Sequence, residues 1–521
     1  MRRFRLASLK RLAPQLDDRG NVAVLTALAI APVCVAGLGA MDLARVTSAK
    51  SQLQDALDSA ALAAARTNSP DAAALKTAGD RYLKQSLAQL GSDFTLARTS
   101  FTFGPQGQVV ASATLKVTPF VAGLVTGGDM EVGASAEVVR ADQKVEIALV
   151  LDTTGSMSEG SKLSDMKKAA KQFITFMEDV SKKAIEPDAI RISLVPFANT
   201  VRVDENDYRY ATWIDQSGTS PVNNEIFTTS SGTQAANRFT LFSQLRTTWK
   251  GCVEMRQAPY DVQDTAPTTD ATLYTPYFAP DEPDSKTTGY GQDYQNDYVA
   301  DDTNSKDWRV RQGMITKYAK SLKGELSTSF GPNRGCAVKK VKRLTTDYSS
   351  LRSAIDDLEA AGNTNIPIGM SWGWNTVSPT LPFKDGADYG KSGFKKVVVL
   401  MTDGENTMDQ RDTPNDGSYA ATGYIWQGRV LKANKSPLQQ GASSADRTAA
   451  LDSRLALMCE NMKAKGIEIY TIRVEVSTGS STLLKTCATA DDYYYDVKSS
   501  SNLTNVFQSI AGQIAALHLS K

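Results

Sequence analysis

Residues 144–158 read KVEIALVLDTTGSMS, and this stretch decides the fold that the sequence predicts. Residues 145–151 are mostly β-branched residues and leucine, which is typical of a strand buried on both faces of a sheet. The strand continues directly into Asp152, Thr154 and Ser156. In an open α/β sheet, ligands bind at the carboxyl ends of the strands, so these side chains form a candidate site.

These three side chains offer one carboxylate and two hydroxyl oxygens. Oxygen ligands suit a hard cation such as Mg²⁺, which keeps some of its waters and takes few carboxylates. The hydroxyls are neutral, so a bound ion keeps positive charge and can capture a carboxylate from outside.

Two later stretches supply further oxygen ligands. Residues 362–364 (GNT) follow a predicted helix and place a third hydroxyl in a loop. Residues 396–401 (KVVVLM) predict a second buried strand, and TDGE follows it. The predicted metal ligands are Asp152, Thr154, Ser156, Thr364 and Asp403.

The order D-x-T-x-S, then G-x-T, then a strand ending in T-D-G-E resembles the von Willebrand factor type A domain and its metal-ion-dependent adhesion site. Thr154 stands where many members have serine, and it keeps the hydroxyl. The resemblance implies a doubly wound, Rossmann-like α/β domain over residues 142–521. It also implies that Mg²⁺, or Mn²⁺ in its place, bridges to an Asp or Glu of a protein partner. The alternative is a degenerate domain whose site binds nothing.

The amino terminus predicts a membrane anchor. Residues 1–20 carry six basic and two acidic side chains, a difference of +4, and residues 21–41 contain no charged side chain. A helix of that length, at about 1.5 Å per residue, matches a hydrocarbon core about 30 Å thick. The basic flank should stay in the cytoplasm, so residues 1–20 form a cytoplasmic leader and residues 21–41 a transmembrane helix. A cleaved signal peptide is the alternative.

Residues 42–141 predict a pilin-like helix followed by a small α+β module. The pattern over residues 44–66 is helical, and a second helix is expected at 72–89. Alternating segments at 101–103, 109–117 and 131–140 predict strands. The first helix carries a stripe of small and apolar residues, which packs either on its own module or on a partner helix: Ala49, Leu53, Leu57, Ala60 and Ala64.

An insertion at about 205–345 interrupts the strand–helix alternation of the type A domain. It is rich in Trp, Tyr, Pro and Asp. Its acidic stretch, residues 293–307, lacks the spacing of a calcium loop, and we expect a solvated loop there. A long insertion near a metal site also suggests a recognition surface.

Further motifs resemble the TadE/TadG-type pilus-assembly proteins: RGNVAVL at 19–25, WKGCVE at 249–254, PYFAP at 276–280, WGW at 372–374 and LMTDGEN at 400–406. The resemblance implies a membrane-anchored protein of tight-adherence (Flp) pilus assembly. Such a protein crosses the bacterial inner membrane once, with its amino terminus cytoplasmic and its bulk periplasmic. The implied partner is a pilus-assembly component that offers an Asp or Glu carboxylate. The alternative is a structural brace whose metal only stabilises the fold.

The charge balance and the histidine content give no support for nucleic-acid binding or for common enzyme mechanisms. The 58 basic and 57 acidic residues leave a net charge of +1, which gives no argument for nucleic-acid binding. The single histidine, His518, rules out Ser-His-Asp, Cys-His and His-based zinc chemistry in the body of the chain. There is also no Walker A loop, which disfavours a chelatase-type subunit. We therefore do not expect an enzyme.

Four of the five cysteines lie outside the predicted span, which contains Cys34. Four cysteines allow three pairings, and two sequence-local pairs, Cys252–Cys336 and Cys459–Cys487, are the simplest. A Cys₄ zinc site is the rival, but the sequence has no C-x₂-C spacing.

Overall fold

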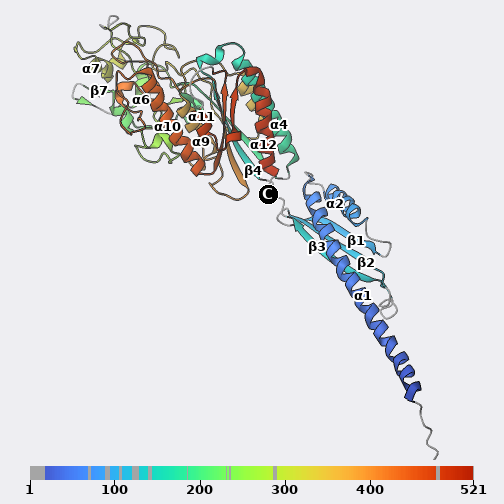
Figure 1. Ribbon diagram of the computed structural model, residues 1–521. Coiled ribbons are helices and arrows are strands. Elements are labelled where there is room, and N and C mark those ends of the chain that lie inside the picture. The colour runs from blue at the N-terminus through green and yellow to red at the C-terminus, as the bar shows by residue number, and fades with distance from the viewer. Residues whose placement is uncertain are drawn as a thin grey trace, which may run out of the picture. The chain divides into compact units, whose positions relative to one another are not determined.

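The computed structural model describes residues 18–67, 72–88, 94–104, 108–119, 128–138, 143–184, 186–229, 232–233, 236–284, 290–476 and 482–519. The chain forms two compact units, residues 1–140 and 141–521, which are described separately (Figure 1). Most of the predicted cytoplasmic leader, residues 1–17, lies outside the described residues.

The first unit begins with one long helix, α1 (Asp18–Ala65), which contains Pro32. The predicted membrane span and the pilin-like helix are both part of α1. The helix from Leu25 to Ala65 contains a stretch that is long and apolar enough to cross a membrane, with a mean hydropathy of 1.9. Leu28 and Val33 are 68% and 69% exposed in this helix. Such exposed apolar side chains need a lipid or protein environment.

The rest of this unit is a small α+β module. Helix α2 (Ala72–Leu87) and the carboxyl-terminal half of α1 pack on an antiparallel sheet of β1 (Phe94–Phe103), β2 (Val109–Val117) and β3 (Met130–Val138). Leu53 and Leu57 are fully buried there, so the stripe of α1 packs on its own module. Strand β1 begins at Phe94, before the predicted start at 101, and the predicted strand end at 139–140 lies outside the described residues.

The second unit is built on a six-stranded sheet of order β10-β5-β4-β11-β12-β13. Strand β10 pairs antiparallel to β5 at the edge, and the other pairs are parallel. The predicted doubly wound α/β fold is therefore confirmed. The strands are β4 (Lys144–Asp152), β5 (Ile190–Phe197), β10 (Lys342–Thr345), β11 (Phe394–Thr402), β12 (Ile467–Val474) and β13 (Tyr494–Val497).

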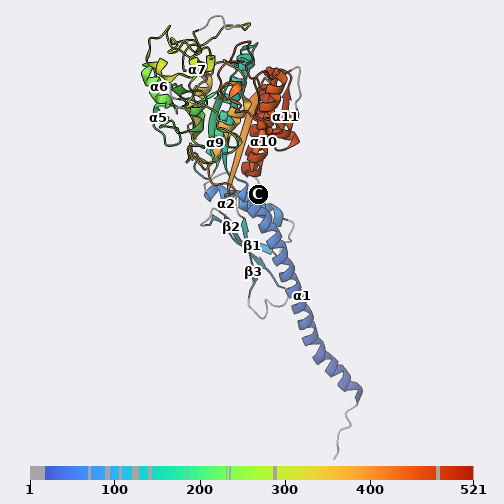
Figure 2. The same ribbon diagram turned by 90° about the vertical axis from the view of Figure 1, so that its left-hand side faces the viewer.

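Helices cover both faces of this sheet (Figures 1 and 2). One face packs on α4 (Lys162–Lys183), α8 (Tyr348–Asp356) and α12 (Leu503–Leu519). The other packs on α9 (Ile366–Val377), α10 (Ser444–Ala464) and α11 (Thr482–Cys487). Strand β4 contributes alternate side chains to the two cores, as its mostly apolar sequence predicts. Gly373 of α9 lets this helix approach β4, because a Cβ there would lie 2.4 Å from Val150.

The insertion between β5 and β10 is a packed part of the domain. Its aromatic residues Phe227, Phe278 and Tyr318 share one hydrophobic core with the sheet residues Val150 and Val398. Its regular elements are short: β6 (Val201–Arg202), α5 (Glu205–Tyr208), β7 (Thr228–Thr229), β8 (Gly232–Thr233), α6 (Arg238–Gln244), β9 (Cys252–Val253) and α7 (Trp308–Gly313).

The expectation of a solvated acidic loop at 293–307 is wrong in its centre. Tyr298 and Val299 are fully buried, and their backbone N–H groups donate to Oδ1 of the buried Asp281. The Nζ of Lys317, which is also fully buried, lies 2.7 Å from the other oxygen of Asp281. Acidic residues enter this core because each finds a donor or cation there.

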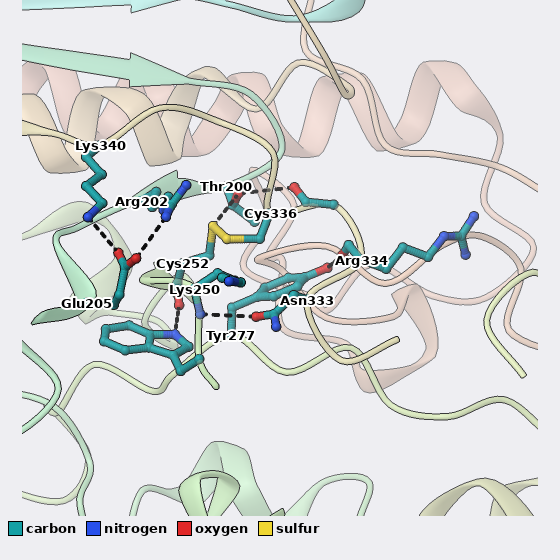
Figure 3. The surroundings of a disulfide bond; sticks show 12 residues. Thr200, Arg202, Glu205, Lys250, Cys252, Tyr277, Asn333, Arg334, Cys336 and Lys340 are labelled. Carbon is teal, nitrogen blue, oxygen red and sulfur yellow. Dashed lines mark hydrogen bonds and ion pairs between the residues drawn. A yellow bond between two sulfur atoms is a disulfide. The ribbon is translucent and has the colours of Figure 1, made fainter. Parts of the chain in front are cut away.

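Both predicted disulfides, Cys252–Cys336 and Cys459–Cys487, are present, which confirms the sequence-local pairing and removes the Cys₄ zinc alternative. The first joins β9 to the segment before β10, and Figure 3 shows it beside Thr200, whose hydroxyl lies 3.4 Å from Cys252 Sγ. The second joins α10 to α11.

Replacing both cysteines of a pair by serine should lower the free energy of unfolding, because the bond restricts the unfolded chain. For sequence separations of 84 and 28 residues the expected losses are about 4–5 and about 3–4 kcal/mol. Urea unfolding followed by tryptophan fluorescence measures this, since all six tryptophans lie in the second unit. Cys34→Ser is the control and should unfold like wild type. Unchanged unfolding of both double variants would contradict the prediction.

Candidate metal centre

Asp152 is the last residue of β4 and is completely buried. Its Oδ1 accepts a hydrogen bond from the Thr154 backbone N–H at 2.8 Å, and its Oδ2 accepts one from Thr402 Oγ1 at 2.6 Å. Burial raises the pKa of Asp152 to about 6, and the nearby Asp403 adds to this, while the two hydrogen bonds oppose it. The carboxylate is thus held in place at an electrostatic cost that a cation would offset.

A chain of hydrogen bonds links the hydroxyls after β4 to the residue after β11. Thr154 Oγ1 lies 3.1 Å from Ser156 Oγ, and Ser156 Oγ donates to Asp403 Oδ1 at 2.7 Å. These side chains meet because β4 and β11 are adjacent and parallel, so their carboxyl ends lie at the same edge of the sheet. The order of strands reverses there, which is the expected position for a ligand site in this fold.

Thr364 is brought to the same place by its loop. The Gly155 N–H donates to the Gly362 carbonyl at 2.9 Å, which ties this loop to the one after β4. A Cβ added at Gly404 would lie 3.6 Å from Thr364 Oγ1 and 4.0 Å from Ser156 Oγ, so both hydroxyls face the same small space. The structure therefore brings together all five residues that the sequence singled out.

Lys162 is also part of this site, although no sequence motif marks it as a site residue. Its Nζ lies 3.0 Å from Asp403 Oδ2, 3.0 Å from Glu159 Oε2 and 3.4 Å from the Ser156 carbonyl oxygen. The side chain is 9% exposed and that of Asp403 is 0% exposed. Burial by itself lowers the pKa of Lys162, but the bonds to Asp403 and Glu159 outweigh it and raise the pKa.

One sequence signal could have drawn attention to Lys162. It is the first residue of α4, and a cation in the first turn of a helix is unfavourable next to the positive end of the helix dipole. A basic residue at that position, six residues after Ser156, suggests a carboxylate partner nearby.

The donor set fits a hard divalent cation. Three hydroxyls and two carboxylates converge, and all are oxygen ligands. In the described part of the chain no group of three or more His, Cys, Asp or Glu side chains is placed to hold a metal ion. A metal at this centre would therefore depend on the hydroxyls of Thr154, Ser156 and Thr364.

The fold and the placement of these side chains define a von Willebrand factor type A-like α/β domain, preceded by an apolar amino-terminal helix and a small sheet module. Residues 20–67 match the family model described as putative Flp pilus-assembly TadE/G-like. The TadE/TadG resemblance drawn from the sequence is thus confirmed, with the match lying in the α1 segment. Comparison with curated proteins gives no match.

Similar solved structures include the pilus adhesin SpaC from Lactobacillus rhamnosus GG, at 11% identity and TM-score 0.34, covering 81% of this chain and 34% of SpaC. The chain thus spans about a third of the length of SpaC. The von Willebrand factor domain of the type V pili tip protein Mfa5 from Porphyromonas gingivalis has 11% identity and TM-score 0.34, with coverages of 74% and 98%. Proximal thread matrix protein 1 from the mussel byssus, solved with a zinc-occupied MIDAS motif, has 14% identity and TM-score 0.27, with coverages of 73% and 47%. We draw no conclusion about ligands or partners from similarities at this level.

Lys162→Met should destabilise the metal-free protein by roughly 3 kcal/mol, because it leaves the buried Asp403 carboxylate without its counter-ion. Urea unfolding in the presence of a chelator measures the loss. The matched control is Lys171→Met on the same helix, whose ion pair with Asp356 is exposed and worth less than about 1 kcal/mol. In an Asp403→Asn background the Lys162 substitution should cost little. Equal losses for Lys162→Met and Lys171→Met would show that the buried pair has no special weight.

Proposed function

We propose that Asp152, Thr154, Ser156, Thr364 and Asp403 bind Mg²⁺, or Mn²⁺ in its place, and that the bound ion receives a carboxylate from a protein partner. The observation that carries this proposal is the convergence of Thr154, Ser156 and Asp403 through contacts of 3.1 and 2.7 Å at the carboxyl ends of β4 and β11. The resemblance to the metal-ion-dependent adhesion site supports the same five ligands.

The residues have different roles in this proposal. The hydroxyls of Thr154 and Ser156 coordinate the ion directly, and Thr364 supplies the third hydroxyl. Both oxygens of Asp152 already accept hydrogen bonds from the protein, so Asp152 acts on the ion through water. Asp403 faces the hydroxyls with one oxygen and Lys162 with the other, so it contributes one oxygen or a bound water.

The charges of the site favour an anionic ligand. Among the buried side chains, two carboxylates and the Lys162 ammonium give a net charge of −1, and a divalent ion changes this to +1. Glu159 also contacts Lys162, but its side chain is 72% exposed, so water and salt screen its charge. A buried site with net positive charge and a free coordination position attracts a carboxylate. Lys162 thereby makes the occupied site more dependent on an outside Asp or Glu than two carboxylates alone would.

The surrounding chain gives this site a cellular setting. The match of residues 20–67 and the apolar part of α1 support a membrane-anchored protein of pilus assembly. In our proposal residues 1–20 are a cytoplasmic leader and residues 21–41 cross the bacterial inner membrane. The second unit lies in the periplasm, where its two disulfides are stable. The partner is then a pilus-assembly component, and the role is adhesive or assembling rather than enzymatic.

A structural brace is the second candidate, in which the metal only stabilises the fold. One observation weighs against it. All four carboxylate oxygens of Asp152 and Asp403 already have partners within the protein: Thr154, Thr402, Ser156 and Lys162. A fold whose buried carboxylates are satisfied in this way does not require a metal to form.

Millimolar Mg²⁺ or Mn²⁺ should raise the thermal unfolding temperature of the full chain in detergent, because an ion that binds the native state stabilises it. The gain is about 2.7 kcal/mol at a hundredfold excess over Kd. Asp152→Asn removes the charge of the carboxylate and keeps its shape, and it should lower the affinity of the site for the ion by at least about tenfold. Asp356→Asn, an exposed carboxylate on α8, is the matched control and should shift like wild type.

Lys162→Met should show the opposite change, with Mg²⁺ binding tighter than in wild type, because the ion takes over the neutralisation of Asp403. Identical responses of wild type and Asp152→Asn to both metals would falsify the metal site.

The proposed orientation places the carboxyl end in the periplasm, because the basic leader precedes the span. A reporter phosphatase that folds only in the periplasm should be active when fused after Lys521, and a reporter that works only in the cytoplasm should be inactive at the same position. The reverse pair of activities would show that the orientation is wrong.

A further inference from the structure

A polar cleft lies beside the candidate metal centre and is walled by the insertion. Its volume is about 310 Å³, enough for an amino-acid side chain and part of its backbone. Gly362 and Asn363, which directly precede the predicted ligand Thr364, form one side of it. Arg334 and Ser329 of the insertion are on its wall, together with Asn199.

The side-chain amide of Asn199 is held between two glycines at this cleft. A Cβ at Gly335 would lie 2.9 Å from Asn199 Nδ2, and a Cβ at Gly362 would lie 3.0 Å from Asn199 Oδ1. The φ values are +88° at Gly335 and +84° at Gly362, and residues with a side chain rarely adopt such values. Asn199 Oδ1 is buried and has no hydrogen-bond partner among the described residues. A buried acceptor without a donor is costly and calls for a ligand that supplies one.

Arg334 presents a second unused group at the same place. Its backbone is fixed, because its carbonyl oxygen accepts a hydrogen bond from Tyr277 Oη at 2.8 Å and the next residues lead into the Cys252–Cys336 disulfide. Figure 3 shows its side chain extending away from that disulfide without an interaction to the residues drawn. Within the described part of the chain the guanidinium makes no hydrogen bond or close ion pair, and its charge acts only at longer range on the buried Glu282, where it opposes the rise in pKa that burial causes. An arginine on a fixed backbone with a free guanidinium is suited to bind a carboxylate through two hydrogen bonds.

We propose that this cleft binds an acidic peptide segment of the partner that carries two carboxylates. One carboxylate binds the metal ion beside Thr364, and the second binds the Arg334 guanidinium. A shift of the Asn199 amide toward the cleft, from its covered position between Gly335 and Gly362, lets a backbone N–H of the same segment donate to Asn199 Oδ1. The inference rests on the proposed function, since the first carboxylate needs the metal. It adds that the partner is recognised through a pair of acidic residues at a defined spacing.

Short peptides with blocked ends and a fluorescent label test this by fluorescence polarisation with the full chain in detergent and millimolar Mg²⁺. The series carries two Asp residues separated by one to five Gly residues, with matched peptides in which either Asp is replaced by Asn. One spacing should bind best, and a chelator should abolish its binding. Arg334→Gln should lower the affinity for this peptide about tenfold, which is the typical effect of losing one charged hydrogen-bonded pair. It should not change the binding of the one-Asp peptides.

Two variants and one measurement control the experiment. Arg246→Gln removes an exposed arginine of the insertion that does not line this cleft, and it should bind like wild type. Arg334→Lys keeps the charge and should retain part of the preference. The thermal shift with Mg²⁺ should be the same in Arg334→Gln and wild type, because Arg334 touches no proposed metal ligand.

If a two-Asp peptide binds in a metal-dependent way but Arg334→Gln does not change its affinity, the proposed role of the cleft is wrong and the proposed metal site still stands. A normal Mg²⁺ shift without binding of any two-Asp peptide would overturn the acidic-peptide ligand. Loss of both the Mg²⁺ shift and peptide binding in wild type would instead reject the proposed function on which the inference rests.

Discussion

The parallel pairing of β4 with β11 is the constraint on which the candidate site depends. Leu151 pairs with Met401, so the next residues of both strands, Asp152 and Thr402, stand side by side and share a hydrogen bond of 2.6 Å. The register is fixed by burial, because both strands are covered on both faces and a slip of one residue would exchange the contents of two cores. The pairing of the two strands is therefore enough to bring side chains that are far apart in sequence into one small space.

This dependence explains which features the sequence predicts. Strands β4 and β11 are recognisable because each contains a run of apolar residues that ends in oxygen-bearing side chains. Thr364 follows from its place in the G-x-T motif after a predicted helix. The sequence does not predict the partner of Lys162, because a lysine in the first turn of a helix gives no distance to Asp403. It also does not predict Asn199 and Arg334, whose proximity to the cleft is set by loop geometry.

The insertion shows a different limit of sequence reasoning. An acidic and aromatic composition suggests solvated loops, because the cation that neutralises each carboxylate is distant in sequence. In the folded chain Asp281 meets Lys317, and Glu254 meets both Arg238 and Arg429, all in buried positions. Buried pairs contribute little net stability, but breaking one is costly, so they hold the insertion in one arrangement. Together with the Cys252–Cys336 bond they hold the described part of the insertion as a wall beside the site.

The ammonium of Lys162, held next to Asp403, affects how the candidate site would bind a metal ion and a partner. Lys162 neutralises one carboxylate in the absence of metal, so the empty site is stable and its hydroxyls remain in position. The same ammonium weakens the attraction for a divalent ion, and in the proposed function the buried groups of the occupied site carry a net charge of +1. In the proposed function a partner carboxylate removes that excess charge, so metal and partner would each strengthen the binding of the other by the same factor. On this proposal metal occupancy is highest where the partner is bound, and the membrane-anchored protein binds divalent ions tightly only within the assembly that it joins.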